Sequence, residues 1–152
     1  MNKKNIFLAA PISAFNNEIQ YLEHRKKIIK LLHTLKEFFH VESEVKKINK
    51  YSTYDNPKTA AIQDFNLIDN CDIFILYHPQ KMQTSSLIEL GYAYAKNKKI
   101  IIISNRVSIP YLASKLHEIT TNVKFVEAIE LDEMSISKIL SVALLMSQNE
   151  KK

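Results

Sequence analysis

The chain has 152 residues, of which 46% are hydrophobic and 24% charged, and its formal net charge is +5. This length allows one core of ordinary size, so residues 1–152 are expected to form a single domain. The aliphatic runs are too short to span a bilayer, and the positive charges are not arginine clusters interleaved with aromatic residues, so neither a membrane nor a nucleic acid is an expected partner.

Two residue types set further limits on the class of protein. Gly91 is the only glycine, which excludes the glycine-rich phosphate loops of Rossmann and P-loop proteins. Cys71 is the only cysteine and cannot form an internal disulfide, which favours a cytoplasmic location. A phosphate site in this chain would therefore depend on hydroxyl groups and helix N-termini.

Short apolar segments alternate with amphipathic segments along the chain, a pattern typical of a parallel sheet covered by helices on both faces. The expected strands are residues 6–9, 41–45, 73–77, 100–103 and 123–126. The expected helices are residues 17–39, 58–69, 86–96, 111–117 and 134–146, and the polar segment 46–57 is expected to be a loop. Five strands predict a flavodoxin-like α/β fold, a three-layer sandwich with a five-stranded parallel sheet.

In such sheets the ligand crevice forms at the carboxyl ends of the strands, near the point where the strand order reverses. The loops expected there begin at Ala10, Lys46, His78 and Ser104. His78 is the one histidine expected to line the crevice, and the histidines show no zinc-ligand spacing, so neither a metal nor a cofactor is expected.

Glu89 has two interpretations from its surroundings alone. The segment from Ser86 to Glu89 fits a capping box, in which Ser86 caps a helix and Glu89 reaches back to its amide. A carboxylate near the positive end of the helix dipole also favours its ionised form, which suits a nucleophile at neutral pH. Ser85 and Ser86 offer hydroxyls for a phosphate at this helix start. Asp64, without other information, reads as an exposed helix aspartate.

Three segments in order resemble the nucleoside 2-deoxyribosyltransferase superfamily, which includes deoxynucleoside monophosphate N-hydrolases. The first is a strand that runs into a small-residue loop, IFLAAPIS. The second, QDFNLIDNCDIFILY, has an aspartate eight residues before the aspartate that opens the next strand. The third and most specific is IELGYAYAKNKKIIII. The resemblance covers roughly residues 4–126.

The resemblance implies an enzyme that cleaves or exchanges the N-glycosidic bond of a nucleoside or nucleoside 5′-monophosphate through a glycosyl-enzyme. It makes Glu89 the nucleophile and Asp64 the aspartate that positions and protonates the substrate. It also implies a homodimer or higher homo-oligomer, in which Asn122 reaches the neighbouring subunit's site. The expected substrate-binding residues are Pro11, Ser13, His78, Gln83, Ser85, Ser86 and Asn122.

The chain departs from the family pattern in ways that bear on its substrate. Family members usually have glycines where Ala10, Ser85 and Leu87 stand, and the transferases usually have an acidic residue where Gln83 stands. Hydrolysis is therefore expected over base exchange. Two alternatives stay open: a TIR-like NAD glycohydrolase, which also places a glutamate on a helix beside the third strand, and a nucleotide-binding module that has lost catalysis.

Overall fold

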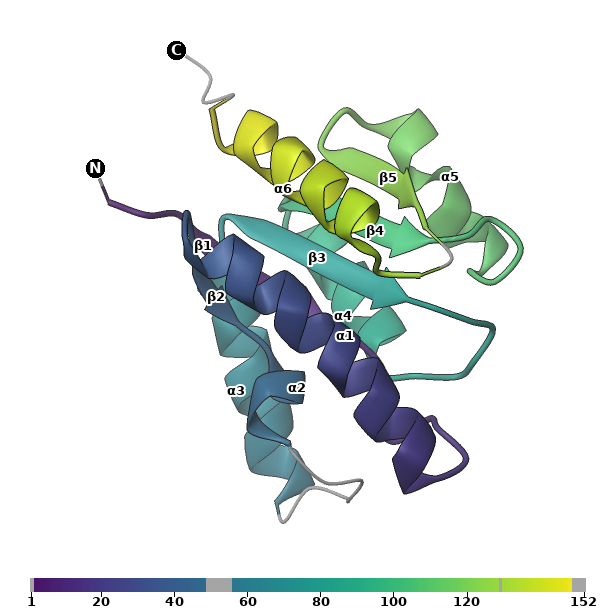
Figure 1. Cartoon of the computed structure of the whole chain (residues 1–152). Helices are drawn as coiled ribbons and strands as arrows, with labels where there is room; N and C mark the ends of the chain where they lie inside the picture. Colours follow the sequence, from purple (N-terminus) through teal and green to yellow (C-terminus); the bar gives the residue numbers. More distant parts are fainter. Residues whose placement is uncertain (1, 49–55, 129, 149–152) are drawn as a thin grey trace.

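Five parallel strands form one sheet in the computed structural model, which describes residues 2–48, 56–128 and 130–148 (Figure 1). The strand order is β2-β1-β3-β4-β5, the flavodoxin-like order, which confirms the predicted fold class. The strands are β1 (Asn5–Ala9), β2 (His40–Glu42), β3 (Ile73–His78), β4 (Lys99–Ser104) and β5 (Val123–Glu127).

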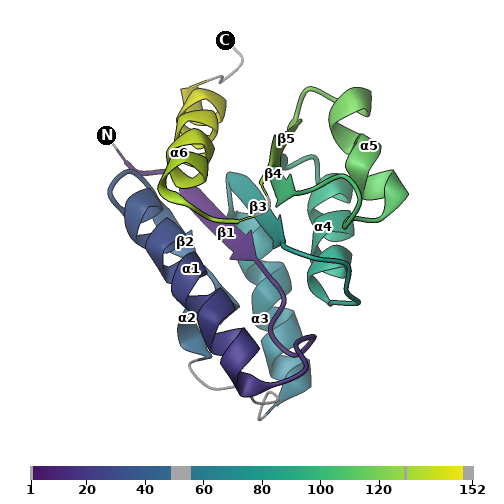
Figure 2. The same ribbon diagram turned by 45° about the vertical axis from the view of Figure 1, so that its right-hand side comes forward.

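Helices cover both faces of the sheet (Figure 2). On one face lie α1 (Glu18–Lys36) and α6 (Glu133–Gln148), and on the other lie α3 (Pro57–Asn70), α4 (Ser86–Ala95) and α5 (Tyr111–Ile119). The alternation of side chains along β3 explains the two layers: Ile75 and Tyr77 pack towards α1 and α6, whereas Phe74 and Leu76 pack towards the other helices. Both faces of the central strands are buried, as expected for a parallel sheet.

Polar side chains fix the ends of the helices. The side chain of Asn17 accepts a hydrogen bond from the amide of Gln20 at 3.0 Å and so caps α1. Asn56 caps α3 in the same way, and Pro57 occupies its first position. These two caps place the helix starts within a residue of the predicted ones.

The turn between α4 and β4 is tied to the start of β3. Asn97 has a φ of 55°, and the ammonium of Lys98 donates to the carbonyls of Asp69 at 2.7 Å and Cys71 at 3.0 Å. The phenol of Tyr92 also donates to Asp69, at 2.7 Å. These bonds fix α4 relative to α3 and the sheet, and thereby fix the position of Glu89.

The second strand differs from its prediction. It ends at Glu42, and the chain then turns through Ser43 into the short helix α2 (Glu44–Lys47). Val45, which was expected to lie in the strand, is buried from this helical turn. Of the predicted loop 46–57, the first two residues belong to α2, Pro57 begins α3, and residues 49–55 lie outside the described residues.

Among the described residues, no helix has the length and apolar character that a membrane crossing needs.

Candidate active site

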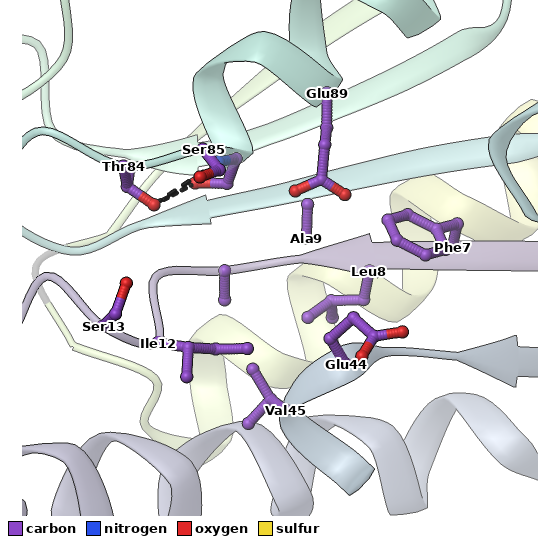
Figure 3. A pocket seen from close by; sticks show the side chains of 12 residues that line it. Phe7, Leu8, Ala9, Ile12, Ser13, Glu44, Val45, Thr84, Ser85 and Glu89 are labelled. Atoms are coloured by element: carbon purple, nitrogen blue, oxygen red, sulfur yellow. Dashed lines mark hydrogen bonds between the residues drawn. The ribbon is translucent and has the colours of Figure 1, made fainter. Parts of the chain in front are cut away.

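A narrow pocket lies beside β1 at the carboxyl end of the sheet, against the first turns of α4 (Figure 3). It therefore occupies the crevice predicted from the strand order. Its volume is about 40 Å³, below the roughly 300 Å³ at which typical small-molecule sites begin. The lining residues come from β1 and the loop after it, from α2, and from the start of α4: Phe7, Leu8, Ala9, Ala10, Ile12, Ser13, Glu44, Val45, Thr84, Ser85, Ser86 and Glu89.

Glu89 is the fourth residue of α4, and its carboxyl group points across the pocket towards Ala9 on β1 (Figure 3). Burial raises the pKa of Glu89 from 4.5 to about 7, and the negative charge of Glu44 adds to the rise. No side chain or amide in the described ranges donates a hydrogen bond to this carboxylate. The group therefore exists in both protonation states near neutral pH.

This result corrects the expectation drawn from the helix dipole. The dipole favours an ionised Glu89, but the desolvation of the carboxyl between α4 and β1 has the larger effect and favours the protonated form. Which effect is larger depends on the packing of β1 against α4, and the local sequence around Glu89 does not contain that information.

Glu44 is the second carboxylate of the pocket and was not predicted as a site residue. It is the first residue of α2 and lines the pocket with Val45. Glu44 was expected to lie inside the strand at residues 41–45, where a site residue was not sought. A strand that ends at Glu42 would have brought Glu44 to the carboxyl edge of the sheet, where site residues were sought.

Hydroxyl groups surround the start of α4. The hydroxyls of Thr84 and Ser86 are 3.0 Å apart and hydrogen-bonded, and Ser13 and Ser85 line the same pocket. The predicted capping box is not formed, because α4 begins at Ser86, and the residue at the cap position, Ser85, makes no side-chain cap bond. The first amides of α4 donate to Thr84 and Ser85, so the hydroxyls are the groups here that could bind a phosphate.

Asp64 and His78, both predicted site residues, do not line this pocket. Asp64 is half-buried on α3, the helix that packs beside α4. His78 is fully buried at the end of β3, and burial lowers the pKa of its ring. In the described part of the chain neither ring nitrogen has a hydrogen-bond partner, although the backbone of Ser108 comes near the ring. His78 is thus an interior residue and not a crevice residue.

The remaining predicted residues divide between the two ends of the sheet. Pro11 is buried beside the pocket, and its carbonyl contacts the ring of His24 at 2.9 Å. Gln83 is exposed and lines a neighbouring hollow with Leu87. Asn122 lies at the opposite, amino end of the sheet, where its carbonyl accepts a hydrogen bond from the amide of Ile100. Within one protomer, Asn122 therefore does not reach the Glu89 pocket.

No group of three or more His, Cys, Asp or Glu side chains that could hold a metal ion occurs among the described residues. The groups available for chemistry in this pocket are two carboxylates and several hydroxyls.

The family model described as nucleoside 2-deoxyribosyltransferase matches residues 6–128.

The chain belongs to this family.

Three solved structures are similar to the chain in fold. The CMP N-glycosidase BcmB of Clostridium botulinum is 26% identical, with a TM-score of 0.68, over 90% of this chain and 98% of that one. BlsM is 17% identical, with a TM-score of 0.73, over 97% of this chain and 96% of its own. A conserved protein from Enterococcus faecalis V583 is 15% identical, with a TM-score of 0.51, over 96% of each chain.

The last two likenesses show the fold alone, and no curated protein matches the chain. Membership of the nucleoside 2-deoxyribosyltransferase family and the likeness to an N-glycosidase support an enzyme of the N-glycosidase or glycosyltransferase type.

Proposed function

We propose that the protein hydrolyses the N-glycosidic bond of a nucleoside 5′-monophosphate, with Glu89 as the nucleophile. The observation that carries this proposal is a buried glutamate with a pKa of about 7, set in the crevice beside a helix start rich in hydroxyls. The likeness to a CMP N-glycosidase makes CMP the first substrate to test.

The chemistry follows from the two carboxylates. Ionised Glu89 attacks the anomeric carbon while the bond to the base breaks, and the base leaves with the bonding electrons and takes up a proton. Water then attacks the glycosyl ester and releases Glu89, so the configuration of the sugar is retained. Glu44, which lines the same pocket, is placed to accept the proton of that water. Asp64 keeps the role implied by the family, which is to position and protonate the substrate.

The phosphate in this proposal binds the hydroxyls of Ser13, Ser85 and Ser86 at the start of α4, near the positive end of the helix dipole. Gln83 is exposed beside this site and stands where the transferases usually have an acidic residue. Water is therefore the expected acceptor, and hydrolysis of a monophosphate should outrun transfer of the sugar to a second base.

The substrate is identified by incubating the protein with CMP, dCMP, cytidine and NAD and measuring the free base by chromatography. Base released from a monophosphate, and not from cytidine or NAD, is the expected result. Glu89→Gln should lower this release by at least about a thousandfold. The matched control is Glu42→Gln, which replaces an exposed glutamate on β2 and should release the base at the rate of the unaltered protein. Turnover of NAD alone would favour the TIR-like alternative, and no turnover would favour a binding module.

A homo-oligomer is part of the proposal, supported by the outer face of α4. Ile88 is 67% exposed there, and a Cβ at Gly91 would meet no atom within 4 Å. The small surface at Gly91 is therefore open to a second copy of the chain. Sedimentation should give a dimer or larger, and Ile88→Glu should shift it towards the monomer. If Asn122 completes a neighbour's site, Asn122→Ala should lower substrate affinity.

A further inference from the structure

A second cavity of about 340 Å³ lies on the α1 side of the sheet, separate from the Glu89 pocket. The loop after β1 contributes to both cavities: Ser13 lines the Glu89 pocket, and Phe15 lines the second cavity. The volume is at the lower end of the range for small-molecule sites. No residue of this cavity has a role in the function proposed above.

The inner wall of the cavity is aromatic. The ring of His24 is stacked on that of Tyr77, with centroids 5.6 Å apart and planes 9° apart, and lies 4.5 Å from the ring of Phe15. Burial lowers the pKa of His24 to about 4, so the ring is neutral. Its Nε2 is 2.9 Å from the carbonyl of Pro11, which can only accept, so Nε2 carries the proton and Nδ1 is an acceptor.

The hydroxyl of Tyr77 is a polar group without a partner. The residue is only 2% exposed, yet within residues 2–48, 56–128 and 130–148 this hydroxyl makes no hydrogen bond. Burial and then the charge of Glu130 raise the pKa of Tyr77 to about 12, so the phenol stays protonated. Since Glu130 also lines the cavity, the hydroxyl end of Tyr77 faces it. This hydroxyl is not fully enclosed, so it is able to donate a hydrogen bond to a ligand in the cavity.

The charges at the mouth of the cavity exclude a phosphate. Glu23 and Glu130 supply two negative charges against the single positive charge of Lys27 among the lining side chains. Carboxylates accept hydrogen bonds, and aromatic rings provide a face for stacking. The matching ligand is planar, uncharged or positive, and carries amino groups that donate to the carboxylates.

We infer that this cavity binds an amino-bearing heteroaromatic ring without a phosphate, of the nucleobase class, stacked near Tyr77 and hydrogen-bonded to Glu130. The inference depends on residues outside the Glu89 pocket. If the proposed hydrolysis is not observed, the inferred base site is unaffected. If the base site is not observed, the proposed hydrolysis is unaffected.

The test is calorimetric titration of the protein with adenine and cytosine, with AMP and CMP as the phosphorylated probes. The free bases should bind, and Glu89→Gln should bind them with unchanged affinity. Glu130→Gln, which loses a charged acceptor, should weaken binding about tenfold or more, and Tyr77→Phe, which loses a neutral hydrogen bond, about twofold to tenfold. Glu133→Gln, on α6 outside the cavity, is the matched control and should bind as the unaltered protein does.

Three results would overturn the inference. The first is no binding of either base at millimolar concentration. The second is binding that Glu89→Gln abolishes and Glu130→Gln leaves intact, because that would place the base in the Glu89 pocket. The third is that Glu89→Gln binds AMP or CMP more tightly than it binds the free bases, and that Lys27→Gln weakens the binding of these nucleotides. That result would make the cavity an anion site. Tyr77→Phe and Glu130→Gln both preserve side-chain shape, and their circular dichroism should match that of the unaltered protein.

Discussion

The raised pKa of Glu89 makes a stability prediction that needs no substrate. The unfolded chain ionises Glu89 near 4.5, whereas the folded protein keeps it protonated until about 7. As the pH rises from 4.5 through 7, the unfolded state loses this proton first, so the folded protein loses stability over that interval. Gln is neutral at every pH and resembles the protonated carboxyl, so Glu89→Gln should escape this loss.

The size of the effect follows from the two pKa values. Each pH unit between them corresponds to about 1.4 kcal/mol, so the gap from 4.5 to about 7 amounts to about 3 kcal/mol. The variant and the unaltered protein should therefore have similar free energies of unfolding at pH 4.5. Above pH 7.5 the variant should be the more stable by up to about 3 kcal/mol.

Urea unfolding of both proteins at half-unit intervals from pH 4.5 to 8.5 measures the difference, in which the other titrating groups cancel. Glu42→Gln, at an exposed position on β2, should differ from the unaltered protein by no more than about 0.5 kcal/mol. A difference between Glu89→Gln and the unaltered protein that stays constant with pH would refute the reasoning. So would a variant that is less stable than the unaltered protein at pH 8.

Three further predictions concern the site and its helix. In Glu44→Gln, the midpoint of the acidic limb of the pH profile of kcat/KM should fall from about 7 by no more than about one pH unit, because Glu44 is the smaller of the two causes that raise the pKa of Glu89. An unchanged midpoint would show that Glu44 does not raise this pKa. Asp64→Asn should lower kcat about a hundredfold, as loss of a general acid does, and should leave the midpoint of the acidic limb of kcat/KM near 7. An unchanged kcat would assign Asp64 a structural role. Gly91→Ala should raise the free energy of unfolding of the monomer by about 0.5–1 kcal/mol, since Ala is the better helix former and the space is open. A loss of stability at every protein concentration would contradict this, whereas a loss that grows with concentration would place Gly91 in the proposed subunit contact.

The sheet was predictable because its strands are continuous aliphatic runs. Residues 73–77 and 100–103 have too many β-branched and aromatic side chains in a row for an exposed element, so a buried parallel strand was the consistent interpretation. The edge strand was the weak point. An apolar residue at every second or fourth position fits both a strand and a helical turn. Val45 therefore fitted the strand pattern, but it is buried as a residue of the helix α2.

The site was predictable only as far as its location. The helix that carries Glu89 and the hydroxyls before it follow a strand, so their presence in the crevice could be inferred from chain order. His78 could not be placed, because β3 runs one residue further than expected and carries the ring into the interior. The ionisation of Glu89 also depends on tertiary packing, which no local pattern reports.

The short edge strand has a consequence for the behaviour of the protein at high concentration. An edge strand exposes unpaired amides and carbonyls that can recruit a strand from another molecule, and the risk grows with strand length and apolar character. β2 has three residues, of which His40 and Glu42 are exposed. Directly after it, α2 turns the chain out of the plane of the sheet. Replacing Ser43 and Glu44 by β-branched residues would extend this edge, and the expected result is fibrous aggregation under conditions in which the unaltered chain stays dispersed.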